Sequence, residues 1–127
     1  MIAEEVFFLL YVADQARSAR YYREVLDVEP VLDVDGITEF RLRDGCVVAV
    51  MPVASVGKVL GHAVFPSTSN VPKAEVYLVV DDPESYHGRA LERGGLELSP
   101  MQERDWGHRA AYSVDPDGHV LAFAEKL

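Results

Sequence analysis

The chain has 127 residues, of which 49% are hydrophobic and 26% are charged. These proportions are those of an ordinary soluble domain, so the composition excludes a disordered or low-complexity protein. The 21 acidic residues outnumber the 12 basic ones and give a net charge of −9, which excludes nucleic acid and anionic membranes as partners, because both bind proteins through basic side chains.

The first predicted element is a strand over residues 6–12, where β-branched and aromatic side chains follow one another. The most apolar stretch, residues 6–13, is far shorter than the roughly 18 to 20 residues that cross a bilayer. Glu4 and Glu5 precede it, whereas an export signal carries basic residues in this place. We therefore expect a cytoplasmic protein that does not enter a membrane.

The pattern that follows predicts one helix and three strands. Apolar residues recur at three- and four-residue spacing over residues 14–26, as an amphipathic helix requires. Three strand-like runs come next, at residues 31–34, 37–42 and 46–53. Cys46 opens the last run and cannot form an internal disulfide, because it is the single cysteine. With Val47 and Val48 beside it, we expect a buried thiol. The predicted order is βαβββ.

A second set of elements repeats this order after a loop. Residues 57–73 lose periodicity and are rich in Gly, Pro and Ser, which predicts a connecting loop. Residues 74–80 then predict a strand, and Asp82 and Pro83 start a helix that Gly94 and Gly95 end. The remaining strands are expected at residues 96–98, 109–114 and 120–124.

The two halves can be aligned by counting. Residues 10–14 correspond to residues 78–82 at an offset of 68, and the turn at residues 44–45 corresponds to residues 117–118 at an offset of 73. The difference between the offsets places about five additional residues in the second half, in a loop expected near residues 101–107. We expect a single domain over residues 1–127, with module one at about 1–56, a linker at about 57–73 and module two at about 74–127.

Two motifs accompany the doubled order of elements. The first helix carries Tyr21-Tyr22-Arg23-Glu24-Val25-Leu26, and the turn before the last strand reads Asp115-Pro116-Asp117-Gly118-His119. In this combination the chain resembles the vicinal oxygen chelate superfamily, which includes glyoxalase I, bleomycin-resistance proteins and extradiol dioxygenases. The resemblance implies an α+β fold in which two tandem βαβββ modules form a cupped, mainly antiparallel sheet. It also implies a homodimer, since a second subunit commonly completes the cup.

In the metal-dependent members of that superfamily, four side chains, usually His, Gln or Glu, hold an ion in the cup. The matching positions of this sequence are Phe7, Ala49, Glu75 and Ala122. Phe and Ala have no donor atom, and one carboxylate does not supply the three or four protein ligands that a divalent ion needs. The histidines do not compensate, because no metal-binding spacing occurs among His62, His87, His108 and His119. We expect neither a metal nor another cofactor.

A cup without a metal is predicted to bind a small molecule. Aromatic side chains would supply contact area, and one or two polar groups would orient the ligand. Bleomycin-resistance proteins sequester a bulky cationic antibiotic in this way, and the charge of −9 favours a cation over an anion. Trp106 is the only tryptophan and lies outside the predicted strands. The predicted ligand-binding residues are Phe7, Phe40, Ala49, Glu75, Trp106, His108, Tyr112 and Ala122.

Two alternative hypotheses remain open. The chain has no Gly-x-Ser-x-Gly motif and no glycine-rich phosphate loop, which argues against the usual nucleophilic catalysis. An enzyme would instead be a lyase or isomerase of the glyoxalase type, with no cofactor and with a buried Glu75 as its base. In the third hypothesis the protein is a non-catalytic relic of the fold that acts through dimer-mediated interaction, and side chains of the protein fill the cup.

Overall fold

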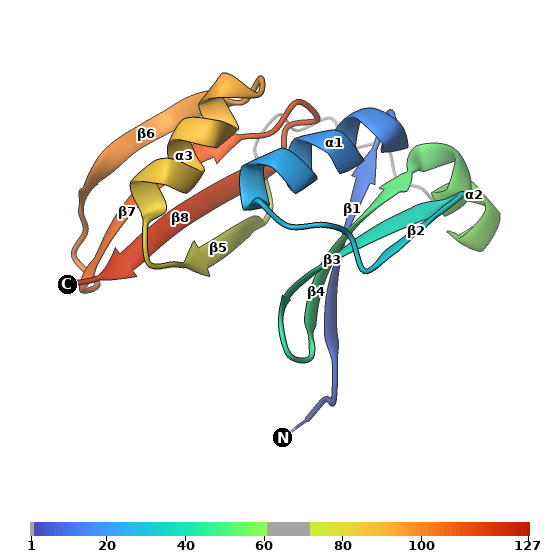
Figure 1. Ribbon diagram of the computed structural model, residues 1–127, viewed down its shortest axis with the longest axis horizontal. Coiled ribbons are helices and arrows are strands. Elements are labelled where there is room, and N and C mark those ends of the chain that lie inside the picture. Colours follow the sequence, from blue (N-terminus) through green and yellow to red (C-terminus); the bar gives the residue numbers. More distant parts are fainter. Residues whose placement is uncertain (1, 61–71) are drawn as a thin grey trace. The chain divides into compact units, whose positions relative to one another are not determined.

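The computed structural model describes residues 2–60 and 72–127. The chain divides into two compact units, residues 1–68 and 69–127, and each unit has its own four-stranded sheet. We call them unit 1 and unit 2 and describe each by itself (Figure 1). No helix within the described ranges is long and apolar enough to cross a membrane.

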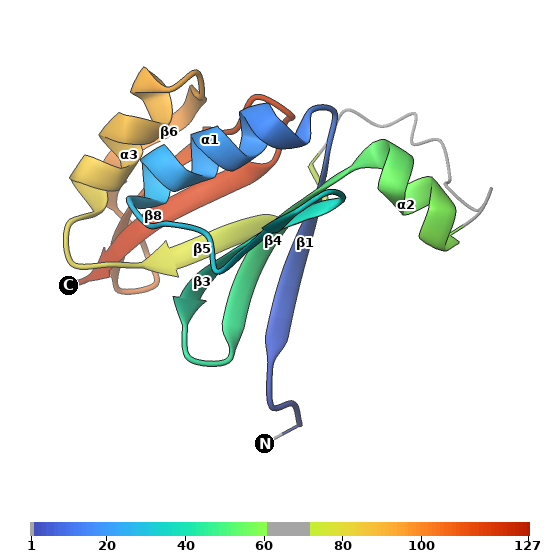
Figure 2. The same cartoon turned by 45° about the vertical axis from the view of Figure 1, so that its right-hand side comes forward.

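Unit 1 contains, in chain order, β1 (Val6–Val12), α1 (Gln15–Leu26), β2 (Leu32–Val34), β3 (Ile37–Arg43), β4 (Cys46–Pro52) and α2 (Val53–Leu60). The strands lie in the order β1-β4-β3-β2. β1 runs parallel to β4, and the other neighbours are antiparallel. β1 is therefore an edge strand of this sheet, beside β4 in both views (Figures 1 and 2).

α1 begins at a capped N-terminus and covers one face of the unit 1 sheet. The carboxylate of Asp14 accepts a hydrogen bond from a backbone N–H of the first turn, which satisfies one of the free donors of the helix end. Further along, Tyr22 is fully buried. The side chain of Gln15 donates to the hydroxyl of Thr38 on β3 at 2.9 Å. Since side chains alternate along a strand, the face under α1 is the one that carries Thr38 and Phe40.

Unit 2 repeats this architecture with β5 (Glu75–Val79), α3 (Pro83–Glu92), β6 (Leu96–Glu103), β7 (His108–Val114) and β8 (Val120–Lys126). Its strands lie in the order β5-β8-β7-β6. β5 is parallel to β8, and the other two pairs are antiparallel. The repeated βαβββ order and the α+β fold class are confirmed.

α3 is capped by the same device as α1. Asp82 accepts hydrogen bonds from the hydroxyl of Ser85 at 2.6 Å and from its backbone N–H at 3.4 Å. Pro83 occupies the first turn, where its missing N–H costs nothing. The ring of Tyr86 stacks on Phe123 of β8, with 5.3 Å between the ring centroids. α3 therefore covers the sheet face that carries Phe123, and Figure 2 shows this helix lying over the unit 2 sheet.

The predicted linker at residues 57–73 begins too early. Residues 53–60 form α2, so residues 57–60 are helical, whereas residues 61–71 lie outside the described ranges. The helix starts directly after Pro52 and contains no second proline that would stop it. Val56 is 3% exposed, so burial of an apolar side chain stabilises this short helix where sequence periodicity is too brief to detect.

The additional residues of the second half lengthen a strand. β2 has three residues and β6 has eight, so the loop predicted near residues 101–107 is wrong for residues 101–103. Pro100 lies within β6, an edge strand, where a proline need not remove a ladder hydrogen bond. Register shifts between Glu97 and Gln102 accommodate the irregular pairing. Trp106 lies in the turn between β6 and β7, outside the strands as predicted.

Candidate functional site

The face of unit 2 opposite α3 collects most of the predicted ligand-binding residues. The strand register places Tyr77 of β5, Ala122 of β8 and Tyr112 of β7 side by side. Phe123, the residue after Ala122, points to α3 instead, and side chains alternate between the two faces of a strand. We call the surface away from the helix the distal face of unit 2; it carries Glu75, Tyr77, His108, Tyr112 and Ala122.

Three aromatic rings on this face form a hydrogen-bonded cluster. The indole N–H of Trp106 donates to the hydroxyl of Tyr77 at 2.9 Å. The same hydroxyl lies 2.7 Å from Nδ1 of His108, and the rings of Tyr77 and His108 stack with their centroids 5.7 Å apart. Trp106 is 54% exposed. The cluster thus holds an exposed aromatic surface in a fixed orientation, which suits stacking against a planar ligand.

Tyr112 lies next to this cluster and beside two charged groups. Its ring is tilted against that of Tyr77 at a centroid distance of 6.4 Å, and the guanidinium of Arg104 lies 5.1 Å from the Tyr112 ring centre. Burial raises the pKa of Tyr112 above its ordinary value, and the nearby Glu75 carboxylate raises it further, whereas Arg104 acts in the opposite direction. The Tyr112 phenol is therefore neutral at physiological pH.

A hollow of about 310 Å³ opens at one end of the distal face, between Glu75, Tyr112 and residues 72–74. Glu75 itself is exposed, so its carboxylate is accessible to a solute. Ala122 is 0% exposed, because it stands between Tyr77 and Tyr112 in the sheet. Its small side chain leaves room for the two rings and offers no surface of its own.

The predicted residues of unit 1 fall on opposite faces of their sheet. Phe7 pairs with Val47 and is 42% exposed, while Ala49 is fully buried. Both lie on the face opposite α1, since Phe40 pairs with Val48 and the neighbouring residues of β4 point the other way. Phe40 is 0% exposed beneath α1. This corrects the prediction for Phe40, a core residue with no surface for a ligand.

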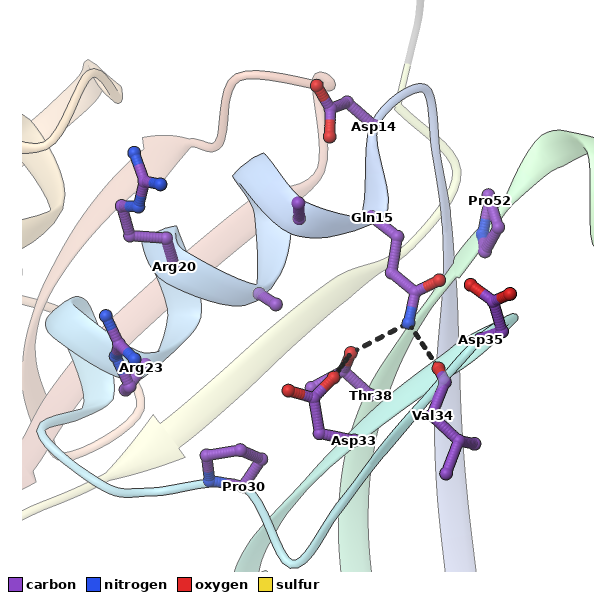
Figure 3. A pocket seen from close by; sticks show the side chains of 12 residues that line it. Asp14, Gln15, Arg20, Arg23, Pro30, Asp33, Val34, Asp35, Thr38 and Pro52 are labelled. Carbon is purple, nitrogen blue, oxygen red and sulfur yellow. Dashed lines mark hydrogen bonds between the residues drawn. The ribbon is translucent and has the colours of Figure 1, made fainter.

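Unit 1 also contains a larger hollow, of about 700 Å³, between α1 and the β2–β3 hairpin (Figure 3). Gln15 lies at its centre and donates to the carbonyl of Val34 at 2.8 Å and to the hydroxyl of Thr38. The side-chain oxygen of Gln15 accepts from the backbone N–H of Gly36 at 3.0 Å. Because the Gln15 amide makes these hydrogen bonds within unit 1, we interpret Gln15 as a structural residue that links the β2–β3 hairpin to α1. Neither the hollow nor the role of Gln15 was predicted from the sequence.

Comparison with known families agrees with this architecture. Residues 6–123 match the Glyoxalase/Bleomycin resistance protein/Dioxygenase superfamily. The chain belongs to this superfamily. The resemblance seen in the sequence motifs is therefore confirmed over nearly the whole chain. A search of the curated proteins gives no match.

Solved structures of the glyoxalase/bleomycin-resistance fold superpose closely on this chain. A glyoxalase-related enzyme from Fulvimarina pelagi has a TM-score of 0.79 at 24% identity, covering 98% of this chain and 89% of the other. A glyoxalase/bleomycin resistance protein/dioxygenase family enzyme from Burkholderia phytofirmans has a TM-score of 0.84 at 15% identity, covering 98% of this chain and all of the other. At these identities the likeness shows the fold alone.

The positions at which metal-dependent members of this superfamily hold their ion do not fit a metal here. Phe7, Ala49 and Ala122 carry no donor atom, which leaves Glu75 alone. In the described ranges no three His, Cys, Asp or Glu side chains gather closely enough for an ion. His87 instead contacts Glu97 at 2.8 Å, and His119 contacts Asp115. His62 lies outside the described residues.

Two residues of the site in this glyoxalase/bleomycin-resistance chain, Tyr77 and Arg104, were not predicted from the sequence. Tyr77 lies two positions after Glu75 on β5, so the period of two along a strand could have identified it. Arg104 gave no such signal. Its guanidinium donates to the carbonyl of Ala110 at 2.8 Å and to the hydroxyl of Ser99 at 2.9 Å. These contacts exist only because the β6–β7 hairpin folds back on itself.

Proposed function

We propose that the protein binds a small aromatic molecule on the distal face of unit 2, without a metal. The observation that carries this proposal is the hydrogen-bonded cluster of Trp106, Tyr77 and His108. An exposed indole that is held by a hydrogen bond loses little conformational freedom when it stacks on a ligand, so its contact area is effective for binding.

We further propose that the preferred ligand carries a positive charge. The exposed Glu75 borders the hollow beside Tyr112, and the charge of −9 attracts cations over a longer range. Tyr112 contributes a neutral aromatic surface. Lys73 lines the same hollow, and its positive charge repels a cation. The preference for a cationic ligand therefore depends mainly on how closely the cation approaches Glu75.

Fluorescence of the single tryptophan tests this function. A cationic glycopeptide antibiotic and the planar cation proflavine are titrated into the protein, and saturable quenching of Trp106 is expected. The Glu75→Gln variant should bind about two- to fivefold more weakly, since an exposed ion pair is lost. Glu103→Gln, an exposed carboxylate at the end of β6, serves as the matched control. Absence of saturable quenching by either probe would contradict the proposal.

The lyase or isomerase hypothesis has less support from the geometry. A carboxylate that works as a general base near neutral pH needs an apolar, buried environment to retain its proton affinity. Glu75 is exposed and lacks this environment. We therefore favour binding without catalysis.

We also propose that the protein is a homodimer that associates through β1. Val6, Phe7, Phe8, Leu9 and Tyr11 are each between 42% and 47% exposed. β1 is also an edge strand, paired within the described residues only with β4. A long apolar edge strand is prone to pair with another chain, and the surface is self-complementary in a twofold dimer.

A cytoplasmic location is the last part of the proposal. It rests on the single Cys46, a free thiol at the start of β4, since exported proteins more often use paired cysteines. Fractionation of cells that produce the protein tests it, and recovery from the extracellular fraction would contradict it.

A further inference from the structure

The proton positions in the aromatic cluster are constrained by the chemistry of its members. The indole nitrogen of Trp106 can only donate a hydrogen bond, so the hydroxyl oxygen of Tyr77 accepts at 2.9 Å. Nδ1 of His108 lies 2.7 Å from the same oxygen. Tyr77 has one hydroxyl hydrogen to place, and its direction decides which nitrogen of His108 carries the imidazole proton.

Two arrangements are compatible with these distances. In one, the Tyr77 hydroxyl donates to Nδ1 of His108. In the other, a protonated Nδ1 donates to Tyr77, whose own hydrogen then has no acceptor among the described residues, because Trp106 and His108 are its only hydrogen-bond partners there. Each arrangement leaves one donor without a partner among the described residues. The first arrangement is favoured, since the Tyr77 hydroxyl then both accepts and donates, and the resulting chain in a single direction, Trp106 to Tyr77 to His108, strengthens both hydrogen bonds.

We propose that His108 is thereby held as the neutral tautomer with its proton on Nε2, and that this N–H selects ligands by their hydrogen-bond acceptors. Nε2 is the ring nitrogen further from the backbone, and in the described part of the chain it has no partner. A ligand carbonyl or ring nitrogen can accept from it directly. A ligand N–H at the same place would require His108 to move its proton to Nδ1 and reverse the hydrogen bond to Tyr77.

This inference rests on the proposed function and refines it, by assigning the ligand class as aromatic molecules with an acceptor atom at the edge of the ring system. Discrimination of this kind is strong when a site presents one fixed donor, because a ligand without an acceptor leaves that donor unpaired. His108 is a specificity-determining residue in this proposal, and Tyr77 and Trp106 are positioning residues that act through it.

The tautomer can be measured without any ligand. Long-range ¹H–¹⁵N spectra of the full-length, histidine-labelled protein distinguish a neutral ring protonated at Nε2 from one protonated at Nδ1, and His108→Gln assigns the signals. We expect the Nε2–H pattern in the wild-type protein and exchange between both tautomers in Tyr77→Phe. Trp106→Phe keeps the Tyr77 hydroxyl and provides a second variant if Tyr77→Phe does not fold. An Nδ1–H pattern in the wild-type protein overturns the proposal.

The selectivity is tested with quinoline and indole, two bicyclic probes that differ in offering a ring-nitrogen acceptor or an N–H donor. Quinoline is expected to bind about five- to tenfold more tightly, as followed by the shift of the His108 Nε2 signal. Tyr77→Phe should remove this preference while both probes still bind. Equal binding, or a preference for indole, overturns the selectivity. If neither probe nor proflavine binds, the proposed function itself fails, whereas proflavine binding with an Nδ1–H tautomer rejects only the role of His108.

Discussion

At the scale of single residues, the distal face of unit 2 places a phenol in an environment that resists its ionisation. Burial is the main cause of the raised pKa of Tyr112, and the Glu75 carboxylate adds to it. A negative phenolate would be partly removed from water and would lie near a second negative charge, and both effects favour the protonated form. Arg104 lowers the pKa but does not reverse the shift.

Tyr112 is therefore expected to ionise above its ordinary pKa of 10.0. Absorbance titration of tyrosinate in the wild-type protein and in Tyr112→Phe isolates this one group by difference. Glu75→Gln should move its midpoint back toward 10.0, because the nearby negative charge is gone. As the pH rises, the unfolded chain loses the Tyr112 proton before the folded chain does, so the free energy of unfolding falls above pH 10.0. A difference midpoint at or below 10.0 would contradict the placement of Tyr112.

At the scale of elements, α1 and α3 each start at an aspartate that follows a strand. Asp14 caps α1 and Asp82 caps α3, and each carboxylate accepts a hydrogen bond from a backbone N–H three residues later. For Asp82, the hydroxyl and the backbone N–H of Ser85 lower the pKa of the carboxyl below 3.8, with a smaller contribution from Arg89. The cap is therefore strongest when Asp82 is ionised.

The stability that the Asp82 cap gives to the N-terminus of α3 is expected to depend on pH. Because the pKa of Asp82 is depressed in the folded state, its stabilising contribution is complete above 3.8 and is lost as the pH falls through the lower folded value. Asp82→Asn keeps a capping oxygen but does not titrate. Urea unfolding followed from neutral pH to below 3.8 should show a steeper loss of stability in the wild-type protein than in this variant. Parallel curves would show that the cap does not depend on charge.

At the scale of the whole molecule, the proposed homodimer depends on the apolar surface of β1. Five of its seven side chains are large, apolar and 42–47% exposed. Exposure of this kind on an edge strand is unfavourable for an isolated chain in water, both through apolar area and through unpaired backbone groups. A second copy would cover both.

Light scattering coupled to size exclusion tests the association. The wild-type protein is expected at twice the chain mass of 14.1 kDa, and Phe8→Glu combined with Leu9→Lys is expected at the monomer mass, because charge on β1 opposes its burial. Leu96→Lys, on a side chain that is 70% exposed on β6, is the matched control and should remain dimeric. A wild-type monomer at tens of micromolar, or a dimeric double variant, would contradict the role of β1.

Much of the fold could be predicted because its signals are local. The strand over residues 6–12 and the two capped helices depend on side chains within a few positions of one another, so the sequence locates them closely. The errors occurred where burial or pairing overrides local pattern. α2 is a short helix with the buried Val56, and β6 continues through Pro100 because an edge strand tolerates it.

The candidate site was predicted only in part, for a related reason. Period-two alternation indicates that Glu75, Tyr112 and Ala122 each share a face with the residues two positions away on the same strand, but it does not say which face a helix covers. Phe40 shows the consequence, since it alternates as expected and yet lies under α1.

The sequence by itself determined the doubled βαβββ order and the helix caps, because each depends on residue type and spacing alone. Only the tertiary structure decided which groups meet. Trp106 reaches Tyr77 across 29 positions, and Tyr77 reaches His108 across 31. Such contacts arise from strand pairing between distant segments, and hydrogen-bond direction, tautomer and selectivity then follow from the few atoms that this pairing brings within 3 Å of one another.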